Sequence, residues 1–446
     1  MPTNCLTAPP RAPFFRFAGP LLAVLTAGCL AARADWPDWR GPAGDGHVPA
    51  GSGGRPAGLP LHWGEAENVR WKTAIPFQGW STPVVQDGKI WLTTATPDGR
   101  DFYAVSVDSA TGRVTFDERL FHCDQPEPLG NPMNSYATPS PVIEAGRVYV
   151  HFGSYGTACL DAATGQTIWQ RSDLPCRHYR GPSSSPVLFG DLLILTMDGA
   201  DLQYLVALEK HTGTNVWKTA RSVPWNDENV PGQMARDGDL RKAHSTPFLT
   251  LVGGTTQMIT AGAKAAYGYD PLTGRELWRV RHDAWSAAAR PVCDQGMAFI
   301  VSGFGGKTEM LGIRLGGAGD VTDSQVAWRC DIAVGKTASP VVVDGLLYMV
   351  SDDGAVSCLE TATGTRVWRE RIGGSYAASP VYGDGRLYFF SREGKTIVME
   401  PGRSCVTVAT NQLAGGFMAS PAVDGNAFIL RTKTHLARVE TAVAKP

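Results

Sequence analysis

Short apolar runs separated by two-residue turns repeat along this chain. In the clearest unit, the apolar run at 338–343 turns at Asp344-Gly345, and the two runs that follow turn at Asp353-Gly354 and Thr363-Gly364. Asp-Gly and Thr-Gly supply the positive φ that tight hairpins need, and the Val, Leu, Tyr and Trp residues between them suit half-buried strands. Each unit is therefore predicted to be four antiparallel β-strands joined by three tight turns.

The unit occurs eight times, at a spacing of about 40 to 60 residues that is typical of propeller blades. Each copy opens at a proline, and these prolines are Pro83, Pro141, Pro186, Pro247, Pro291, Pro340, Pro380 and Pro421. The last copy ends at Glu440 without a fourth strand, whereas residues 68–75 precede the first copy and look like that missing strand. Pairing the two removes exposed sheet edges. The sequence thus predicts an all-β, eight-bladed β-propeller that is closed by an N-terminal strand.

A large aromatic residue recurs four positions after the last turn glycine of most units. A flat side chain at a fixed point of each outer strand can pack between neighbouring blades and bury about 200 Å². We interpret this set as a structural girdle. Its predicted members are Trp71, Phe116, Trp169, Trp217, Trp278, Trp328 and Trp368.

The beginning of the chain has the features of a secretory leader. Arg11 and Arg16 precede an apolar run at 21–30 that is too short to span a membrane. Two processing routes are open. Ala32-Arg33-Ala34 is a small-x-small cleavage site, and the residues that end at Cys29 resemble a lipobox, which would leave a lipid on that cysteine. We favour the first route because the lipobox match is incomplete. Both routes place the protein outside the cytoplasm, periplasmic or secreted, or anchored in the envelope by its lipid.

The domain organisation follows from these features. Residues 1–34 are predicted to be a signal peptide, 35–60 an extended segment and 61–446 the propeller. The formal charge of −1 does not fit a nucleic-acid-binding protein. The cysteines lack the Cys-x-x-Cys spacing of metal sites, although Cys123 and Cys176 could form a disulfide in an oxidising compartment.

The connections between blades indicate which face of the propeller binds a ligand. They are long at 117–134, 171–182 and 221–242, whereas the turns of the opposite face are tight. Loops on a rigid scaffold commonly carry binding sites, and residues just before the innermost strands would line the channel mouth on this face. The candidate ligand-binding residues are Trp80, Tyr136, Arg180, His244, Trp285, Arg290, Lys336, Tyr376 and Phe417. They could hold a planar or anionic ligand, or they could simply fill the wide centre of the ring.

Signals for catalysis are sparse. Ser183-Ser184-Ser185 lacks the glycines of a nucleophile elbow, and the acidic loops at 227–229 and 237–239 do not follow the spacing of a calcium loop. We therefore predict no catalytic residue and no metal site.

The Ser-Pro-Val-x-x-Asp-Gly opening, the Thr-Gly-x-x-x-Trp closing and the eightfold count resemble the pyrroloquinoline-quinone-like (PQQ-like) propeller repeat family over about residues 61–440. The segment Trp36-Pro37-Asp38-Trp39-Arg40-Gly41-Pro42 is similar to the start of a secreted subgroup of that family. The resemblance implies a function like that of one of two known branches. Quinoprotein alcohol dehydrogenases bind the quinone and Ca²⁺ over the channel, and many stack a disulfide of adjacent cysteines on it. The propeller lipoprotein of the outer-membrane barrel-assembly machinery is a non-catalytic scaffold.

This chain has no adjacent cysteines and no set of Asp, Glu and Asn residues assignable to the metal and base. We therefore expect a non-catalytic, monomeric binding or scaffold module without a cofactor, whose partner is an envelope protein or a small ligand. The alternative is a PQQ-dependent oxidoreductase with quinone and calcium in the channel.

Overall fold

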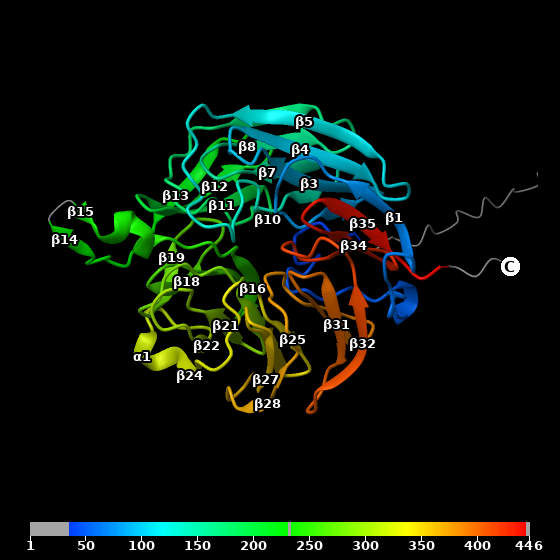
Figure 1. Ribbon diagram of the computed structural model, residues 1–446. Helices are drawn as coiled ribbons and strands as arrows, with labels where there is room; N and C mark the ends of the chain where they lie inside the picture. Colours follow the sequence, from blue (N-terminus) through cyan, green and yellow to red (C-terminus); the bar gives the residue numbers. More distant parts are fainter. Residues whose placement is uncertain (1–34, 231–232, 443–446) are drawn as a thin grey trace, which may run out of the picture. The chain divides into compact units, whose positions relative to one another are not determined.

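A computed structural model describes residues 35–442 except 231–232, and these form a ring of eight four-stranded antiparallel sheets (Figure 1). The predicted all-β propeller is confirmed. The predicted leader, with its cleavage site and Cys29, lies outside the described residues. In the part of the chain that the structure describes, no helix is both long and apolar enough to cross a membrane.

Strands in each of the first four blades are given from the channel outward. Blade 1 consists of β2 (Val84–Gln86), β3 (Lys89–Ala95), β4 (Asp101–Asp108) and β5 (Val114–His122). Blade 2 consists of β6 (Val142–Glu144), β7 (Arg147–His151), β8 (Thr157–Asp161) and β9 (Thr167–Arg171). Blade 3 consists of β10 (Val187–Phe189), β11 (Leu192–Asp198), β12 (Gln203–Glu209) and β13 (Asn215–Ala220). Blade 4 consists of β16 (Phe248–Val252), β17 (Thr255–Ala261), β18 (Ala265–Tyr269) and β19 (Glu276–Arg281).

The remaining blades follow the same order. Blade 5 consists of β20 (Val292–Asp294), β21 (Met297–Val301), β22 (Met310–Arg314) and β24 (Val326–Cys330). Blade 6 consists of β25 (Val341–Val343), β26 (Leu346–Val350), β27 (Ala355–Glu360) and β28 (Arg366–Arg371). Blade 7 consists of β29 (Val381–Gly383), β30 (Arg386–Phe390), β31 (Lys395–Glu400) and β32 (Val406–Gln412). Blade 8 consists of β33 (Ala422–Asp424), β34 (Ala427–Arg431), β35 (His435–Val439) and β1 (Val69–Ala74).

Short elements decorate the connections. A hairpin of β14 (Glu228–Val230) and β15 (Gln233–Met234) projects from the ring between blades 3 and 4 (Figure 1). Short helices occur at η1 (Ser52–Gly54), η2 (Ala235–Arg241) and α1 (Thr322–Gln325).

The ring closes as the sequence predicts. β1 pairs antiparallel with β35, so that Thr73 lies opposite Leu436. Arg431 of β34 crosses from blade 8 to blade 1, where its guanidinium donates hydrogen bonds to the carbonyl oxygens of Ser81 at 2.9 Å and Thr93 at 3.0 Å. The N-terminal strand therefore completes the last blade and leaves β35 with no open edge.

Most girdle tryptophans pack on the last turn of the next blade, where the repeated glycine leaves room for the indole. The indole N–H of Trp71 donates to the carbonyl of Ser109 at 2.9 Å, in the last turn of the next blade. A Cβ on Gly112 of that turn would lie 2.6 Å from the Trp71 ring, and its φ is +74°. Glycine is therefore required both by the turn and by the ring that covers it. Equivalent bonds run from Trp169 to Lys210, Trp217 to Pro271, Trp328 to Thr361 and Trp368 to Gly402.

Two of the predicted girdle positions differ in their contacts. Phe116 covers Gly165 of blade 2 without a polar bond. Trp278 instead donates to Gln257 of its own blade at 2.9 Å. The reason lies in the lengthened last turn of blade 5, where β23 (Gly319–Asp320) pairs in parallel with β19 and adds a fifth strand to blade 4. This turn gives Trp278 no carbonyl in the usual place.

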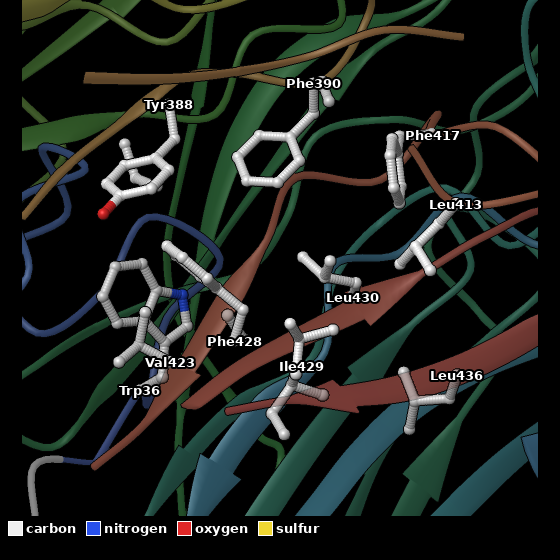
Figure 2. Packing of buried hydrophobic residues seen from close by; sticks show 14 of the residues in the cluster. Trp36, Tyr388, Phe390, Leu413, Phe417, Val423, Phe428, Ile429, Leu430 and Leu436 are labelled. Carbon is white, nitrogen blue, oxygen red and sulfur yellow. The ribbon is translucent and has the colours of Figure 1, made fainter. Parts of the chain in front are cut away.

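The hydrophobic core lies between the blades. Figure 2 shows Phe428, Ile429 and Leu430 of β34 packed in a cluster with Tyr388 and other residues of blade 7. Trp36, which is 1% exposed, belongs to the same cluster. The N-terminal segment is thus part of the core of the ring.

Residues 36–48, which we call the plug, contact the innermost strands around the channel. Trp36 exchanges two backbone hydrogen bonds with Val85 of blade 1, both at 2.8 Å. Farther along, Gly46 and Val48 bond to the backbone of Tyr382 in blade 7, and the His47 ring bonds to the Val342 carbonyl of blade 6. A segment that bonds to inner strands on several sides of the ring must lie across the channel.

Candidate functional site

The residues that precede the blade prolines form a ring of hydrogen bonds around the channel. The backbone N–H of Thr82 donates to the hydroxyl of Ser140 in the next blade at 2.8 Å, and Ser140 donates in the same way to Ser185 at 3.0 Å. The remaining links run from Ser185 to Thr246, Arg290 to Ser339, Ser339 to Ser379, Ser379 to Ser420 and Ser420 back to Thr82. This hydroxyl ring holds the innermost strands in register at the channel wall.

The hydroxyl ring is interrupted between blades 4 and 5, because Arg290 occupies the position of a Ser or Thr. Its guanidinium turns to the plug, where Nη1 lies 2.7 Å from Oδ1 of Asp38, and its Nε donates to the Pro247 carbonyl at 3.0 Å. The Trp39 ring lies beside it, 6.0 Å from the guanidinium carbon. The interruption in the ring is therefore where the plug is anchored.

Arg40 anchors the plug to the other side of the channel. Its guanidinium donates to the carbonyl oxygens of Pro380 at 2.7 Å and Pro340 at 2.8 Å, and to Asp45 within the plug. Burial lowers the pKa of Arg40 to about 10, which leaves it protonated at neutral pH. One buried cation thus joins blades 6 and 7 to the N-terminal segment.

A cavity of about 450 Å³ lies at the channel mouth and has Trp39 of the plug in its wall. Each of the three long interblade connections contributes to it, through Asn134, Arg180 and Asp239 among others. The hydroxyl ring contributes Thr82, Ser140, Ser185, Thr246, Ser379 and Ser420. The cavity therefore opens among the long loops, and its volume is in the range of small-molecule sites.

Four of the residues that the sequence proposed for the mouth line this cavity together. They are Trp80, Arg180, His244 and Trp285. The Trp285 ring packs on Gly305, where a Cβ would lie 2.0 Å from it, so that this glycine permits the position of the indole. Phe304, which precedes that glycine, also lines the cavity.

The other five proposed residues lie elsewhere. Tyr136 is buried in the core between blades 1 and 2, and its hydroxyl donates to the Glu127 carbonyl at 2.7 Å. Tyr376 and Phe417 are each 1% exposed and pack in interblade clusters. Arg290 holds the plug, and Lys336 lies 5.8 Å from the Phe304 ring centroid.

The charged groups of the cavity balance one another. Arg180 binds Asp239 through two bonds, from Nε to Oδ1 at 2.8 Å and from Nη2 to Oδ2 at 3.2 Å. Burial, with the nearby charges of Lys242 and Arg180, holds the pKa of His244 well below its ordinary value. His244 is therefore neutral at pH 7, and the described residues of the lining carry no net charge.

Sequence reasoning did not identify the hydroxyl ring, Trp39 or Phe304 as parts of a site. The hydroxyl ring had a visible signal, because a Ser or Thr stands directly before seven of the eight blade prolines. Trp39 and Phe304 had none, since their positions depend on contacts between distant parts of the chain.

The cysteines and acidic residues form no further centre. All seven cysteines of the described residues are free, so the structure contains no Cys123–Cys176 disulfide. Within those same residues, no three His, Cys, Asp or Glu side chains are grouped so that they could hold a metal ion. The acidic loop residues Asp227 and Asp239 pair with Arg241 and Arg180.

Solved structures share this fold at low sequence identity. BamB from Moraxella catarrhalis superposes with a TM-score of 0.58 at 13% identity, over 83% of this chain and 99% of that chain. Quinohemoprotein alcohol dehydrogenase from Comamonas testosteroni gives 0.62 at 13% identity, over 93% of this chain and 82% of the enzyme. A europium-containing methanol dehydrogenase gives 0.62 at 11% identity, over 92% and 90%. These likenesses establish the fold alone.

No curated protein matches the chain in sequence. A family model does, the PQQ_2 model described as outer membrane protein assembly factor BamB. It matches residues 61–175, 201–314 and 317–404, which together make up well over half of the chain and include strands of every blade. With its eight blades and its repeated Gly and Trp positions, the chain belongs to the PQQ_2 (BamB) family of β-propellers.

Proposed function

We propose that this protein is a non-catalytic binding module of the cell envelope that takes its ligand in the axial cavity. One observation carries the proposal: the cavity gathers polar groups from the three long loops and aromatic side chains from other connections and from the plug that occupies the channel. A concave site with a few converging polar groups on a rigid scaffold is the usual form of a ligand site.

The lining supports binding more than chemistry. Among the described residues, neither ring nitrogen of His244 has a protein hydrogen-bond partner. The hydroxyl groups of the lining residues Ser140, Ser185, Ser379 and Ser420 accept backbone N–H groups, and that of Ser183 accepts the side-chain amide of Asn134. A nucleophilic serine needs a base within hydrogen-bond reach, and Asp239 is already bound to Arg180. The groups of the cavity are thus arranged as contacts for a ligand.

The quinone-dependent alternative has less support. A calcium-bound quinone requires carboxylate and amide oxygens around the metal and a free carboxylate as base. The carboxylate that lines the cavity in the described residues is Asp239, and its ion pair with Arg180 leaves it unsuited to both roles. These residues do not fit the cofactor.

Location and partner are proposed from the leader and the family. The description of the family model names an outer membrane protein assembly factor. The leader-like start of this chain agrees with export from the cytoplasm. We infer an extracytoplasmic module, soluble or lipid-anchored, that meets an envelope protein or a small ligand at its loop-rich face.

Photocrosslinking in cells tests this proposal. A benzoyl-phenylalanine at position 304, in the cavity wall, should give a specific adduct that intact mass spectrometry detects. The matched control is position 272, because Leu272 is 61% exposed and lies in a tight turn of the opposite face. Adducts at 272 and none at 304 would place binding on the opposite face of the propeller and contradict this proposal.

A further inference from the structure

The hydroxyl ring has hydrogen-bonding capacity that the protein leaves unused. The six ring hydroxyls that line the cavity, those of Thr82, Ser140, Ser185, Thr246, Ser379 and Ser420, each accept one backbone N–H. Among the described residues, none of them donates to a protein acceptor. Each therefore retains its proton and one lone pair.

Bulk water has little access to these hydroxyl groups. All six residues are at least 95% buried, and they face one cavity. Buried polar groups are stable when they are hydrogen-bonded, so the cavity wall requires partners that can both accept and donate. A ligand with several hydroxyl groups of its own meets that requirement better than one that only accepts.

Aromatic rings occupy the other walls. Trp80, Trp285 and Phe304 line the cavity above Trp39 of the plug. The indole N–H groups of Trp80 and Trp39 are buried and have no protein partner in the described residues. Such rings offer flat apolar faces to a ring-shaped ligand, together with N–H donors at their edges.

The charge of the lining selects among ring-shaped ligands. Arg180 and Asp239 neutralise each other, and His244 is uncharged, so the lining formed by the described residues contains no unpaired cation. Arg290 is likewise paired with Asp38. A cation close to the lining that has no ion pair in the described residues is Lys336, 5.8 Å from the Phe304 ring centroid. A multiply charged carboxylate would therefore be only partly compensated in this cavity, whereas a neutral ligand needs no counter-charge.

We propose that the axial cavity binds a neutral saccharide, a mono- or disaccharide unit whose ring stacks on Trp80 or Trp285 and whose hydroxyl groups bond to the hydroxyl ring. This inference rests on the proposed binding function and specifies its ligand class. The saccharide is free or is the end of a longer glycan, and both sources present the same chemistry.

Titration calorimetry and tryptophan fluorescence of the purified protein test the inference. The neutral probes are glucose, maltose, N-acetylglucosamine and diacetylchitobiose, and the anionic probes are citrate and pyrroloquinoline quinone. At least one neutral sugar should bind and change the fluorescence, with the disaccharides indicating whether a glycan end is preferred. Binding of an anionic probe alone would overturn the saccharide assignment, as would the failure of every sugar while the adduct at position 304 persists. Loss of that adduct as well would overturn the proposed function itself.

Two variants of Thr246 separate the effect of the hydroxyl group from the effect of the side-chain volume. Thr246→Val keeps the volume and removes the hydroxyl, whereas Thr246→Ser keeps the hydroxyl. Sugar affinity should fall at least fivefold in the first and stay within twofold in the second, with Leu272→Ala as an unaffected surface control. Equal affinity in both Thr246 variants would show that the ring hydroxyls do not contact the sugar.

Discussion

Arg290 and Asp38 form an ion pair, 2.7 Å between Nη1 and Oδ1, at the position where the hydroxyl ring is interrupted. The arginine is 3% exposed, and its partner comes from the N-terminal segment, 252 residues earlier in the chain. The pair thus joins the plug to blade 5, and the plug in turn provides Trp39 to the cavity. Stability and the shape of the proposed site therefore depend on the same contact.

Removing this arginine should destabilise the fold. Arg290→Ala leaves Asp38 without its main partner, and we expect a loss of about 2–4 kcal/mol in the free energy of unfolding, since breaking a buried pair leaves an uncompensated charge. Arg290→Ser should lose less, because its hydroxyl can accept the N–H of Thr246 and complete the ring. Urea unfolding of both variants, alone and combined with Asp38→Asn, measures the coupling energy between the two side chains. If the changes in the free energy of unfolding are additive, the ion pair does not contribute to stability.

The closing strand gives a second prediction. A chain that begins after Ile75 lacks both β1 and the plug, and the loss of β1 leaves β35 as an open edge beside an apolar core. Exposed edges pair with other chains, so this truncation should aggregate or melt far below the parent. Size-exclusion chromatography and thermal unfolding measure this. A monomeric truncation of equal stability would contradict the closure of the ring by β1.

Girdle residues should act on stability and not on binding. Trp368→Ala removes a packed indole and its bond to Gly402, and the expected cost is about 3–5 kcal/mol. Trp368→Phe should cost clearly less, because Phe116 fills the same position in blade 1. Calorimetric melting orders the variants, and sugar affinity, measured below the melting temperature, should be unchanged in both.

Buried histidines predict an acid-sensitive fold. Burial lowers the pKa of His151 to about 3, from about 6.5 in an unfolded chain. Above pH 6.5 the residue is neutral in both states and costs nothing. As the pH falls below 6.5 the unfolded state binds the proton first, so stability is lost by about 1.4 kcal/mol per pH unit until the folded pKa is reached.

His151→Gln is the variant that isolates this effect, because it cannot take up a proton. The slope of unfolding free energy against pH between 6 and 4 should be smaller in the variant than in the parent. Identical slopes would show that His151 is solvated or protonated in the folded protein.

Much of the fold follows from the repeat, and its exceptions have local causes. The blade count, the turns and β1 can be deduced from the spacing of Pro, Gly and Trp. The different contact of Trp278 depends on the lengthened turn of the following blade, where Gly316-Gly317 replaces Thr-Gly. That replacement is visible in the sequence, but the extra strand it forms on blade 4 is not.

The site was harder to predict. Position before an inner strand brings a side chain to the mouth, but the turn geometry decides whether it points to the cavity, as Trp80 does, or into the core, as Tyr136 does. The plug could not be deduced at all, since Arg40 bonds to carbonyl groups about 300 residues away. A buried cation and its carbonyl partners leave no spacing pattern in one sequence.

The absence of turnover is also testable. Purified protein supplied with pyrroloquinoline quinone, Ca²⁺ and an alcohol or aldose should not reduce an artificial electron acceptor above the protein-free rate, because the carboxylate of the described cavity lining, Asp239, is already paired with Arg180. Dye reduction that depends on both quinone and calcium and disappears on chelation would establish the oxidoreductase alternative.

Ligand binding in the axial cavity can be measured through the yield of the position 304 adduct in a Trp80→Ala background. Trp80 lines the cavity and is not a girdle residue, so its replacement should lower the melting temperature much less than Trp368→Ala does. Hot-spot aromatics are typically worth about 2 kcal/mol, which would weaken binding more than tenfold. The adduct at 304 should therefore fall at least tenfold in this folded variant. An undiminished adduct, or a variant that unfolds early, would show that Trp80 only fills the channel.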